Sequence, residues 1–238
     1  MKTTNIDYRV EDTTCTGYLV EPQTQGYKVP GIVMYTNFWG VNEKQKRVAE
    51  KLATMGCCVL VADMYGNQQC GSTFDESAKL MSSVTQNFET YKKRILAPYE
   101  LLKRNPIVKH NKIFSIGYCF GGASSLLLAR MTSDLHGAIS VHGLLNSQLR
   151  ATPQQKMPKM LVLHGARDPM VSEEDIKNFH HEMKACQADY TFISFGLSTH
   201  AFTNTDAAGN ETTAYNFLAD MRSNYLIEQF IKEDFVNA

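Results

Sequence analysis

The sequence predicts an α/β protein with a mostly parallel central sheet, helices on both faces and an N-terminal antiparallel hairpin. Short apolar runs bounded by turn residues are typical of buried parallel strands, and they alternate along the chain with stretches of helical periodicity. Of the 238 residues, 43% are hydrophobic and 20% are charged, which is enough apolar material for a sizeable core. We therefore expect a single domain over residues 1–238.

The elements are expected at definite places along the chain. Polar and apolar residues alternate over 6–10 and 14–20, which predicts the antiparallel hairpin. In chain order, strands are predicted over 31–35, 57–62, 113–117, 137–141, 159–165 and 190–195, and helices over 42–55, 88–103, 122–131, 173–185 and 214–230.

Individual residues mark several of these boundaries. Gly56 is expected to end the helix over 42–55, and Ser172 is a plausible N-cap for the helix over 173–185. Pro98 predicts a kink or a break within residues 88–103. Residues 65–85 show neither period, so we predict an irregular segment there that is either a lid or a surface loop.

Composition excludes several classes of protein. Lys+Arg and Asp+Glu both number 24, so the net charge of zero argues against a basic nucleic-acid binder or a polybasic membrane module. No apolar run approaches the roughly 20 residues of a membrane helix. The N-terminus has no apolar segment of a secretory signal, and the six cysteines form no CxxC pair. We expect free thiols and a cytoplasmic location.

The sharpest local signal is Gly-Tyr-Cys-Phe-Gly-Gly over residues 117–122, between a predicted strand and a predicted helix. It is a G-x-nucleophile-x-G elbow with Cys119 in the place of serine. Glycines leave room for the crossing backbone, and the helix N-terminus favours a thiolate. The backbone N–H of Phe120 is then an oxyanion donor. Alternatively, Cys119 is a small buried side chain beside a glycine turn.

A nucleophile of this kind needs a base, and the base needs a group that orients it. Asp168 and His200 each follow a predicted strand, in the chain order nucleophile, acid, histidine that this architecture uses. Taken singly, Asp168 is as well explained as a turn residue and His200 as a solvated loop residue. Their order and placement together predict a Cys119-Asp168-His200 triad.

The other histidines carry weaker signals. His142 follows the strand over 137–141 and could line the mouth of a pocket, and His164 precedes Gly165 at a strand end. His180 and His181 lie on a predicted helix, where a solvated face is the simpler explanation. No histidine has metal-ligand spacing and no glycine-rich nucleotide motif is present, so we expect no metal and no cofactor.

With these residues in place, the sequence resembles the dienelactone hydrolase family of α/β-hydrolases. The resemblance extends from about Thr16 to Phe235, and it is carried by FWGVNEKQKRVAEKLA, VLVADMYG, IFSIGYCFGGAS, LVLHGARDP, THAFTN and AYNFLADMRSNYLIEQF. It implies the α/β-hydrolase fold, a carboxymethylenebutenolidase-like carboxylesterase or lactonase, and the same three triad residues. It also implies a second oxyanion donor at the Phe38 backbone.

Two positions depart from the family pattern. The best-known members carry a glutamate where this chain has Asn37, which cannot accept a proton, so we hypothesise that Cys119 pairs directly with His200. Dienelactone hydrolases place an arginine at the position of Asn204, which cannot hold a substrate carboxylate in a charge-assisted pair. A neutral ester, lactone or thioester is thus a more plausible substrate than an anionic dienelactone. Arg94 is either an alternative cation or part of a structural ion pair.

The sequence therefore predicts hydrolysis of a small ester or lactone through a thioester on Cys119. Trp39, Tyr118 and Phe202 either wall the substrate pocket, together with Asn37 and Asn204, or belong to the core. The expected partner is a small molecule, without nucleic acid or membrane, and the chain is a monomer or a homodimer. Two alternatives stay open: a thiol redox protein that uses Cys119, with Cys70 as a second thiol, and a non-catalytic binding module on the same fold.

Overall fold

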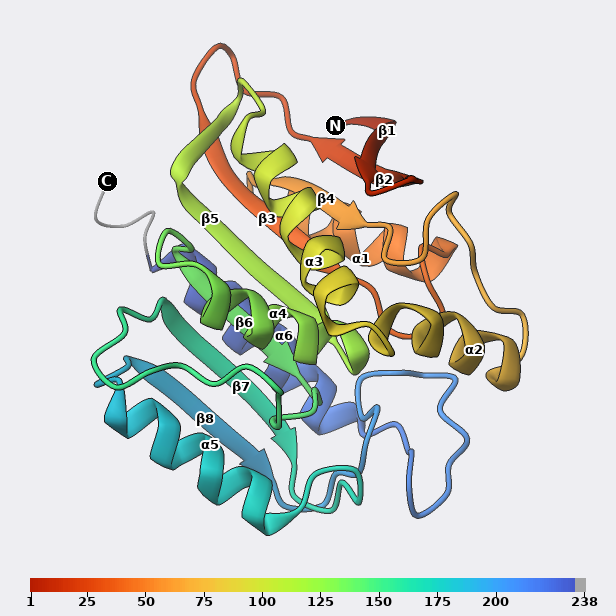
Figure 1. The fold of residues 1–238 in the computed structure, drawn as a ribbon, viewed down its shortest axis with the longest axis vertical. Helices are drawn as coiled ribbons and strands as arrows, with labels where there is room; N and C mark the ends of the chain where they lie inside the picture. The colour runs from red at the N-terminus through yellow and green to blue at the C-terminus, as the bar shows by residue number, and fades with distance from the viewer. Residues whose placement is uncertain (234–238) are drawn as a thin grey trace. The chain divides into compact units, whose positions relative to one another are not determined.

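The computed structural model describes residues 1–233 and forms one eight-stranded sheet in the order β1-β2-β4-β3-β5-β6-β7-β8. The strands are β1 (Lys2–Val10), β2 (Thr13–Glu21), β3 (Val29–Tyr35), β4 (Cys58–Ala62), β5 (Val108–Tyr118), β6 (Gly137–Val141), β7 (Lys159–Gly165) and β8 (Tyr190–Phe195). The helices are α1 (Glu43–Ala53), α2 (Phe74–Thr85), α3 (Phe88–Lys103), α4 (Phe120–Met131), α5 (Glu173–Ala185) and α6 (Phe217–Lys232) (Figure 1). The predicted α/β class and its N-terminal antiparallel strands are confirmed. Phe235, where the family resemblance ends, lies outside the described residues.

The chain divides into two compact units. The first comprises Met1–Ile116 with Asp134–His136, and the second comprises Gly117–Ser133 with the chain from Gly137 onward. The expectation of a single domain stays a prediction. Across the described residues, no helix is both long enough and apolar enough to cross a bilayer.

In the first unit, the hairpin and the buried strands form one ladder. Strand β1 pairs antiparallel with β2 from Lys2↔Glu21 to Val10↔Thr13, and β2 pairs antiparallel with β4. Strand β3 runs parallel to β4, and every residue of both strands is buried, which explains their continuous apolar runs. Helices α1 and α3 pack on these strands.

In the second unit, β6, β7 and β8 are parallel neighbours. Val141 pairs with Leu163, and Gly165 pairs with Phe195, so the three strands end close to one another. Helix α4 packs on β6, and α6 packs on β7. Because the carboxyl ends of parallel strands share one edge, the loops after β6, β7 and β8 emerge together, as open α/β sheets require for a site.

The structure corrects the predictions for residues 65–85, for the start of α6 and for a break at Pro98. The prediction of an irregular segment over 65–85 is wrong for residues 74–85, which form helix α2. Thr73 caps this helix by accepting a hydrogen bond from the Glu76 N–H at 3.2 Å. Its role as a lid stays a prediction. Helix α6 begins at Phe217 rather than at 214, because Asn216 caps it.

Helix α3 continues through Pro98 without a break. Pro98 has no backbone N–H to donate to the Arg94 carbonyl, four residues earlier. The adjacent Ile95 carbonyl accepts from the buried Tyr35 hydroxyl at 2.7 Å. A buried side chain from β3 thus supplies a hydrogen bond in this turn.

Candidate active site

The turn between β5 and α4 holds Cys119 in a conformation that few residues other than glycine adopt. Its backbone has φ 56° and ψ −118°, and α4 begins at the next residue. A Cβ on Gly117 would lie 2.0 Å from the carbonyl oxygen of Gly121, and one on Gly122 would lie 2.9 Å from the Cα of Gly143. Glycine is therefore required at Gly117, the first glycine of the elbow motif, and at Gly122, which follows the second.

The three residues of the predicted triad form a continuous hydrogen-bond chain within the second unit. His200 Nε2 lies 3.0 Å from Cys119 Sγ, and His200 Nδ1 lies 2.7 Å from Asp168 Oδ2. The backbone N–H of Met170 donates to Asp168 Oδ1 at 2.9 Å, which fixes the carboxylate. Asp168 and His200 are 4% and 3% exposed, so bulk water does not screen their interaction.

The two hydrogen-bond partners of His200 favour its protonated form. Burial alone would keep the imidazole neutral, but the hydrogen bonds to Asp168 and Cys119 outweigh it and raise the pKa of His200 to about 10. An imidazolium at this position faces the Cys119 sulfur on one side and a carboxylate on the other. Such an arrangement suits an activated thiol nucleophile.

His142, which the sequence placed at the mouth of a pocket, is buried against the triad. It is 3% exposed, and its ring lies edge-to-face on that of His200 with 5.1 Å between ring centres. Nδ1 lies 3.1 Å from the Cys119 backbone nitrogen, and Nε2 lies 2.9 Å from Thr203 Oγ1. Burial, reinforced by the charge of His200, lowers the pKa of His142 well below the usual value. Its position at the end of β6 was the only sequence signal.

The other site residues predicted in this unit have mixed surroundings. Tyr118 is half-buried and precedes the nucleophile, whereas Phe202 is fully buried and packs on His142 and Phe195. These contacts favour core packing for Phe202. Asn204 forms a turn, in which its side-chain oxygen accepts from the Asp206 N–H at 3.2 Å. Phe120 begins α4.

In the first unit, Asn37, Phe38 and Trp39 form a tight turn after β3. The Asn37 side chain accepts from the Trp39 N–H at 3.1 Å, and the Phe38 carbonyl accepts from the Tyr65 hydroxyl at 2.9 Å. Within the described residues, the Phe38 N–H donates no hydrogen bond. All three side chains are half-buried.

The remaining thiols differ from Cys119 in exposure. Burial raises the pKa of Cys57 and Cys58 to about 12, and raises that of Cys15 to about 11 even though the Arg94 guanidinium lies against it. Arg94 is itself 5% exposed, and its guanidinium donates to Cys15 Sγ rather than to a carboxylate. Cys70 is the exposed thiol of the chain's first 233 residues. Over the same range, no group of three His, Cys, Asp or Glu side chains could hold a metal ion.

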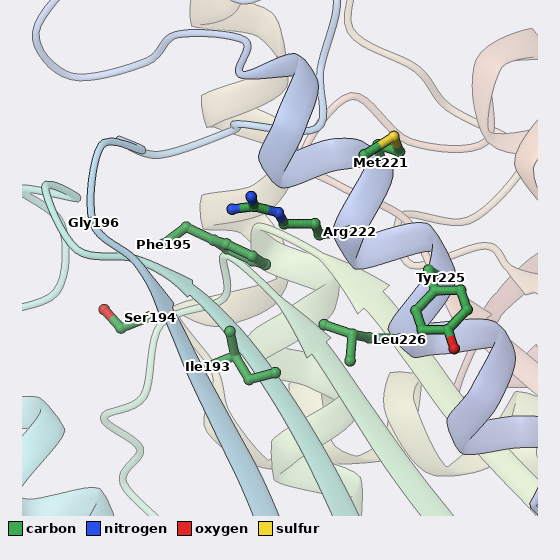
Figure 2. A pocket seen from close by; sticks show the side chains of 8 residues that line it. All are labelled: Ile193, Ser194, Phe195, Gly196, Met221, Arg222, Tyr225 and Leu226. Atoms are coloured by element: carbon green, nitrogen blue, oxygen red, sulfur yellow. The ribbon is translucent and has the colours of Figure 1, made fainter.

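A cavity of about 630 Å³ lies between β8 and α6 (Figure 2). Its lining comprises Ile193, Ser194, Phe195, Gly196, Met221, Arg222, Tyr225 and Leu226. None of the three triad side chains lines it.

The sheet, the elbow and the histidine after the last strand together define an α/β-hydrolase. The family model for the dienelactone hydrolase family matches residues 15–235, and the chain belongs to that family. It is accordingly a carboxylic ester or lactone hydrolase.

Relatives and solved structures agree with this assignment. A Caenorhabditis elegans protein named only as uncharacterised is 36% identical over 60% of this chain and 94% of its own length. A Bradyrhizobium protein named "Probable 2-oxo-3-(5-oxofuran-2-ylidene)propanoate lactonase" is 23% identical over 83% of this chain and 82% of its own. Among solved structures, the dienelactone hydrolase-like promiscuous phosphotriesterase P91 from metagenomic libraries has a TM-score of 0.87 at 28% identity, with 98% of each chain covered. The structure named m3DLH has a TM-score of 0.89 at 29% identity, with the same coverage.

Proposed function

We propose that the protein is a cysteine-dependent hydrolase that cleaves a small ester or lactone through a thioester on Cys119. The observation that carries the proposal is the hydrogen-bond chain from Cys119 Sγ through His200 to Asp168, at 3.0 and 2.7 Å. A nucleophile in contact with a base that a buried carboxylate orients is the arrangement that acyl transfer needs.

In the first step, the Cys119 thiolate attacks the substrate carbonyl and forms a C–S bond. Negative charge develops on the carbonyl oxygen, where the backbone N–H groups of Phe120 and Phe38 are the proposed donors, each worth roughly 3 kcal/mol. When the tetrahedral species collapses, the C–O bond breaks, and the His200 imidazolium gives its proton to the leaving alcohol oxygen. Asp168 holds Nδ1–H throughout, so that Nε2 faces the reacting atoms.

In the second step, water resolves the thioester. Neutral His200 takes a proton from the water as its oxygen attacks the acyl carbon. The C–S bond then breaks, which releases a carboxylic acid and restores the thiolate beside the imidazolium. No metal or cofactor takes part in this scheme.

The substrate is proposed to be a neutral ester or lactone. Asn204 is engaged in a turn and has no positive charge, so it does not offer a substrate carboxylate a bidentate partner. We propose Tyr118, Trp39 and Asn37 as further residues of the substrate pocket. We also propose that the enzyme is cytoplasmic, that it acts as a monomer or a homodimer, and that it binds no nucleic acid.

Hydrolysis of p-nitrophenyl acetate and butyrate by four proteins tests the proposal. They are the wild type, Cys119→Ala, His200→Ala and, as a matched control for loss of a thiol, Cys70→Ser at the exposed cysteine. We expect turnover in the wild type and Cys70→Ser and none above background in the other two. Turnover that survives Cys119→Ala contradicts the proposal.

The two alternatives from the sequence predict different results. A redox protein would show no turnover in any variant, yet Cys119 would form a sulfenic acid with hydrogen peroxide. A binding module would show neither turnover nor alkylation of Cys119 by iodoacetamide.

A further inference from the structure

We propose that His142 is a positioning residue, a neutral bridge that holds the loop of the nucleophile to the loop of the base. The proposal rests on the function proposed above and adds a fourth residue to the three of the triad. His142 touches no reacting atom; it acts through the backbone of Cys119 on one side and through Thr203 on the other.

The hydrogen bonds of His142 determine which nitrogen carries its proton. The Cys119 backbone N–H can only donate, so Nδ1 of His142 must accept at 3.1 Å. In the neutral ring the proton is then on Nε2, which donates to Thr203 Oγ1 at 2.9 Å. One ring thus connects the elbow at Cys119 with the loop after β8 that carries His200.

Protonation would break this bridge. An imidazolium would direct an Nδ1–H at the Cys119 N–H, two donors facing one another, and it would add a second positive charge 5.1 Å from the His200 ring centre. The titratable groups around the ring, within the part of the chain that the structure describes, are Cys119, His200 and Tyr118. A neutral His142 therefore leaves His200 as the cation that faces the thiolate.

The two residues that this hydrogen bond joins both have an uncommon backbone conformation. His142 has φ 40° and Cys119 has φ 56°, a left-handed region that non-glycine residues adopt uncommonly, with Asn, Asp and His enriched among those that do. The His142 N–H donates to the Leu163 carbonyl at 2.8 Å, which fixes the residue to β7. The two residues thus meet through the Cys119 N–H, which His142 Nδ1 shares with the Val141 carbonyl at 3.0 Å.

Three substitutions separate the role of the hydrogen bonds from that of the ring. His142→Asn places an oxygen where Nδ1 was, tolerates the left-handed backbone and loses the Thr203 bond. His142→Phe keeps a flat aromatic ring, although a larger one than imidazole, and loses both hydrogen bonds. Thr203→Val keeps the shape of Thr203 and removes its hydroxyl. Each is assayed for kcat and KM on p-nitrophenyl butyrate and for the pH profile of Cys119 alkylation, with Cys119→Ala as the reference for the proposed function.

We expect His142→Phe to lower kcat by about 100-fold at little changed KM, which is the effect of displacing a reacting group by about 1 Å. Its alkylation profile should move to higher pH, because the thiol and the imidazole no longer share a fixed geometry. His142→Asn should recover most of kcat, and Thr203→Val should lose an intermediate amount. If circular dichroism shows that His142→Phe does not fold, the kcat values and alkylation profiles of His142→Asn and Thr203→Val test the proposal instead.

Several outcomes overturn the proposal. One is a His142→Phe variant with the kcat and alkylation profile of the wild type. Another is a variant that loses kcat while its alkylation profile is unmoved, which would mark a structural role only. A third is a Thr203→Val variant identical to the wild type together with an inactive His142→Asn. If Cys119→Ala still turns over, the proposed function fails first, and the two failures are thereby distinguished.

Discussion

In the proposed mechanism, the reactivity of Cys119 depends on the protonation state of His200. His200 keeps its proton well above the pH at which an ordinary imidazole loses it, since its pKa is raised to about 10 by Asp168 and Cys119 against the effect of burial. In the proposed mechanism this cation faces the Cys119 sulfur at neutral pH, in a chain that has Asn37 where the best-known family members have a glutamate.

This pairing predicts a thiolate that depends on His200. The wild type should show thiolate absorbance near 240 nm below about pH 8, where an ordinary thiol remains largely protonated. His200→Ala should lose that signal, and Cys70→Ser should keep it. As the pH rises through about 10, His200 loses the proton that the leaving group needs, so kcat/KM should fall on that alkaline limb. A thiolate signal that persists in His200→Ala would contradict the pairing.

Asp168 determines the tautomer of His200. In Asp168→Asn the amide still offers an oxygen to the Met170 N–H, but its NH₂ faces Nδ1 and favours the tautomer with the proton on Nε2. We expect kcat to fall by roughly 10³- to 10⁴-fold with the fold intact. Steady-state kinetics with circular dichroism measure both, and a loss below tenfold would argue against the proposed role.

At the scale of elements, the elbow depends on the close approach of α4 to β6. A Cβ on Gly122 would lie 2.8 Å from Ser140 Oγ and 2.9 Å from the Gly143 Cα, so something must shift. Gly122→Ala should therefore destabilise the fold by about 1–3 kcal/mol, as overpacking does, and lower activity.

Gly196 provides the matched control. It follows β8, and a Cβ there meets nothing within 4 Å, so Gly196→Ala should change the free energy of unfolding by less than about 0.5 kcal/mol. Urea unfolding of both variants checks the contrast. Equal effects at the two glycines would show that the close approach is not the cause.

Much of the element pattern could be predicted from the sequence because strands and helices have different periods. The runs over 137–141, 159–165 and 190–195 coincide with β6, β7 and β8. Helix α2 was missed although its apolar residues have helical spacing, since its several Ser and Thr residues also suit loops and its start depends on a cap at Thr73. The beginning of α6 was misplaced because it likewise depends on a cap, at Asn216.

The site could be predicted only in part. The chain order and strand ends placed Cys119, Asp168 and His200 together, because parallel strands share an edge. The bridge through His142 depends on a left-handed backbone and a hydrogen bond to a main-chain N–H, which no residue spacing reveals. The turn that engages Asn204 likewise depends on three-dimensional contacts.

For the whole molecule, acid stability depends on a buried ion pair. Arg130 on α4 and Glu182 on α5 form two hydrogen bonds, at 2.8 and 2.9 Å, and Arg130 also reaches the Leu145 carbonyl. Burial opposes the charge of Glu182, but Arg130, with the Ala151 N–H and Arg150, outweighs burial and lowers the pKa of the carboxyl below its usual 4.5. A lowered pKa in the folded state means stability that is present above pH 4.5 and lost as the pH falls through the folded value.

Glu182→Gln should accordingly cost about 3–5 kcal/mol near neutral pH, because it leaves a buried guanidinium without its counterion. The difference from the wild type should shrink as the pH falls below 4.5. Glu174→Gln on the same helix is the control, since its partner Lys177 lies 3.7 Å away and both side chains are exposed. That change should cost at most about 1 kcal/mol. Urea unfolding between acid and neutral pH measures both, and a pH-independent difference for Glu182→Gln would contradict the account.

The central claim is a covalent acyl group on Cys119, and intact-protein mass spectrometry after rapid acid quench tests it most directly. Mixing the wild type with excess p-nitrophenyl butyrate should give one added butyryl group, which peptide mapping assigns to Cys119 and which hydroxylamine removes. The adduct should be absent in Cys119→Ala and present in Cys70→Ser. Turnover with an acyl group on any other residue, or the same adduct in Cys119→Ala, would contradict the mechanism.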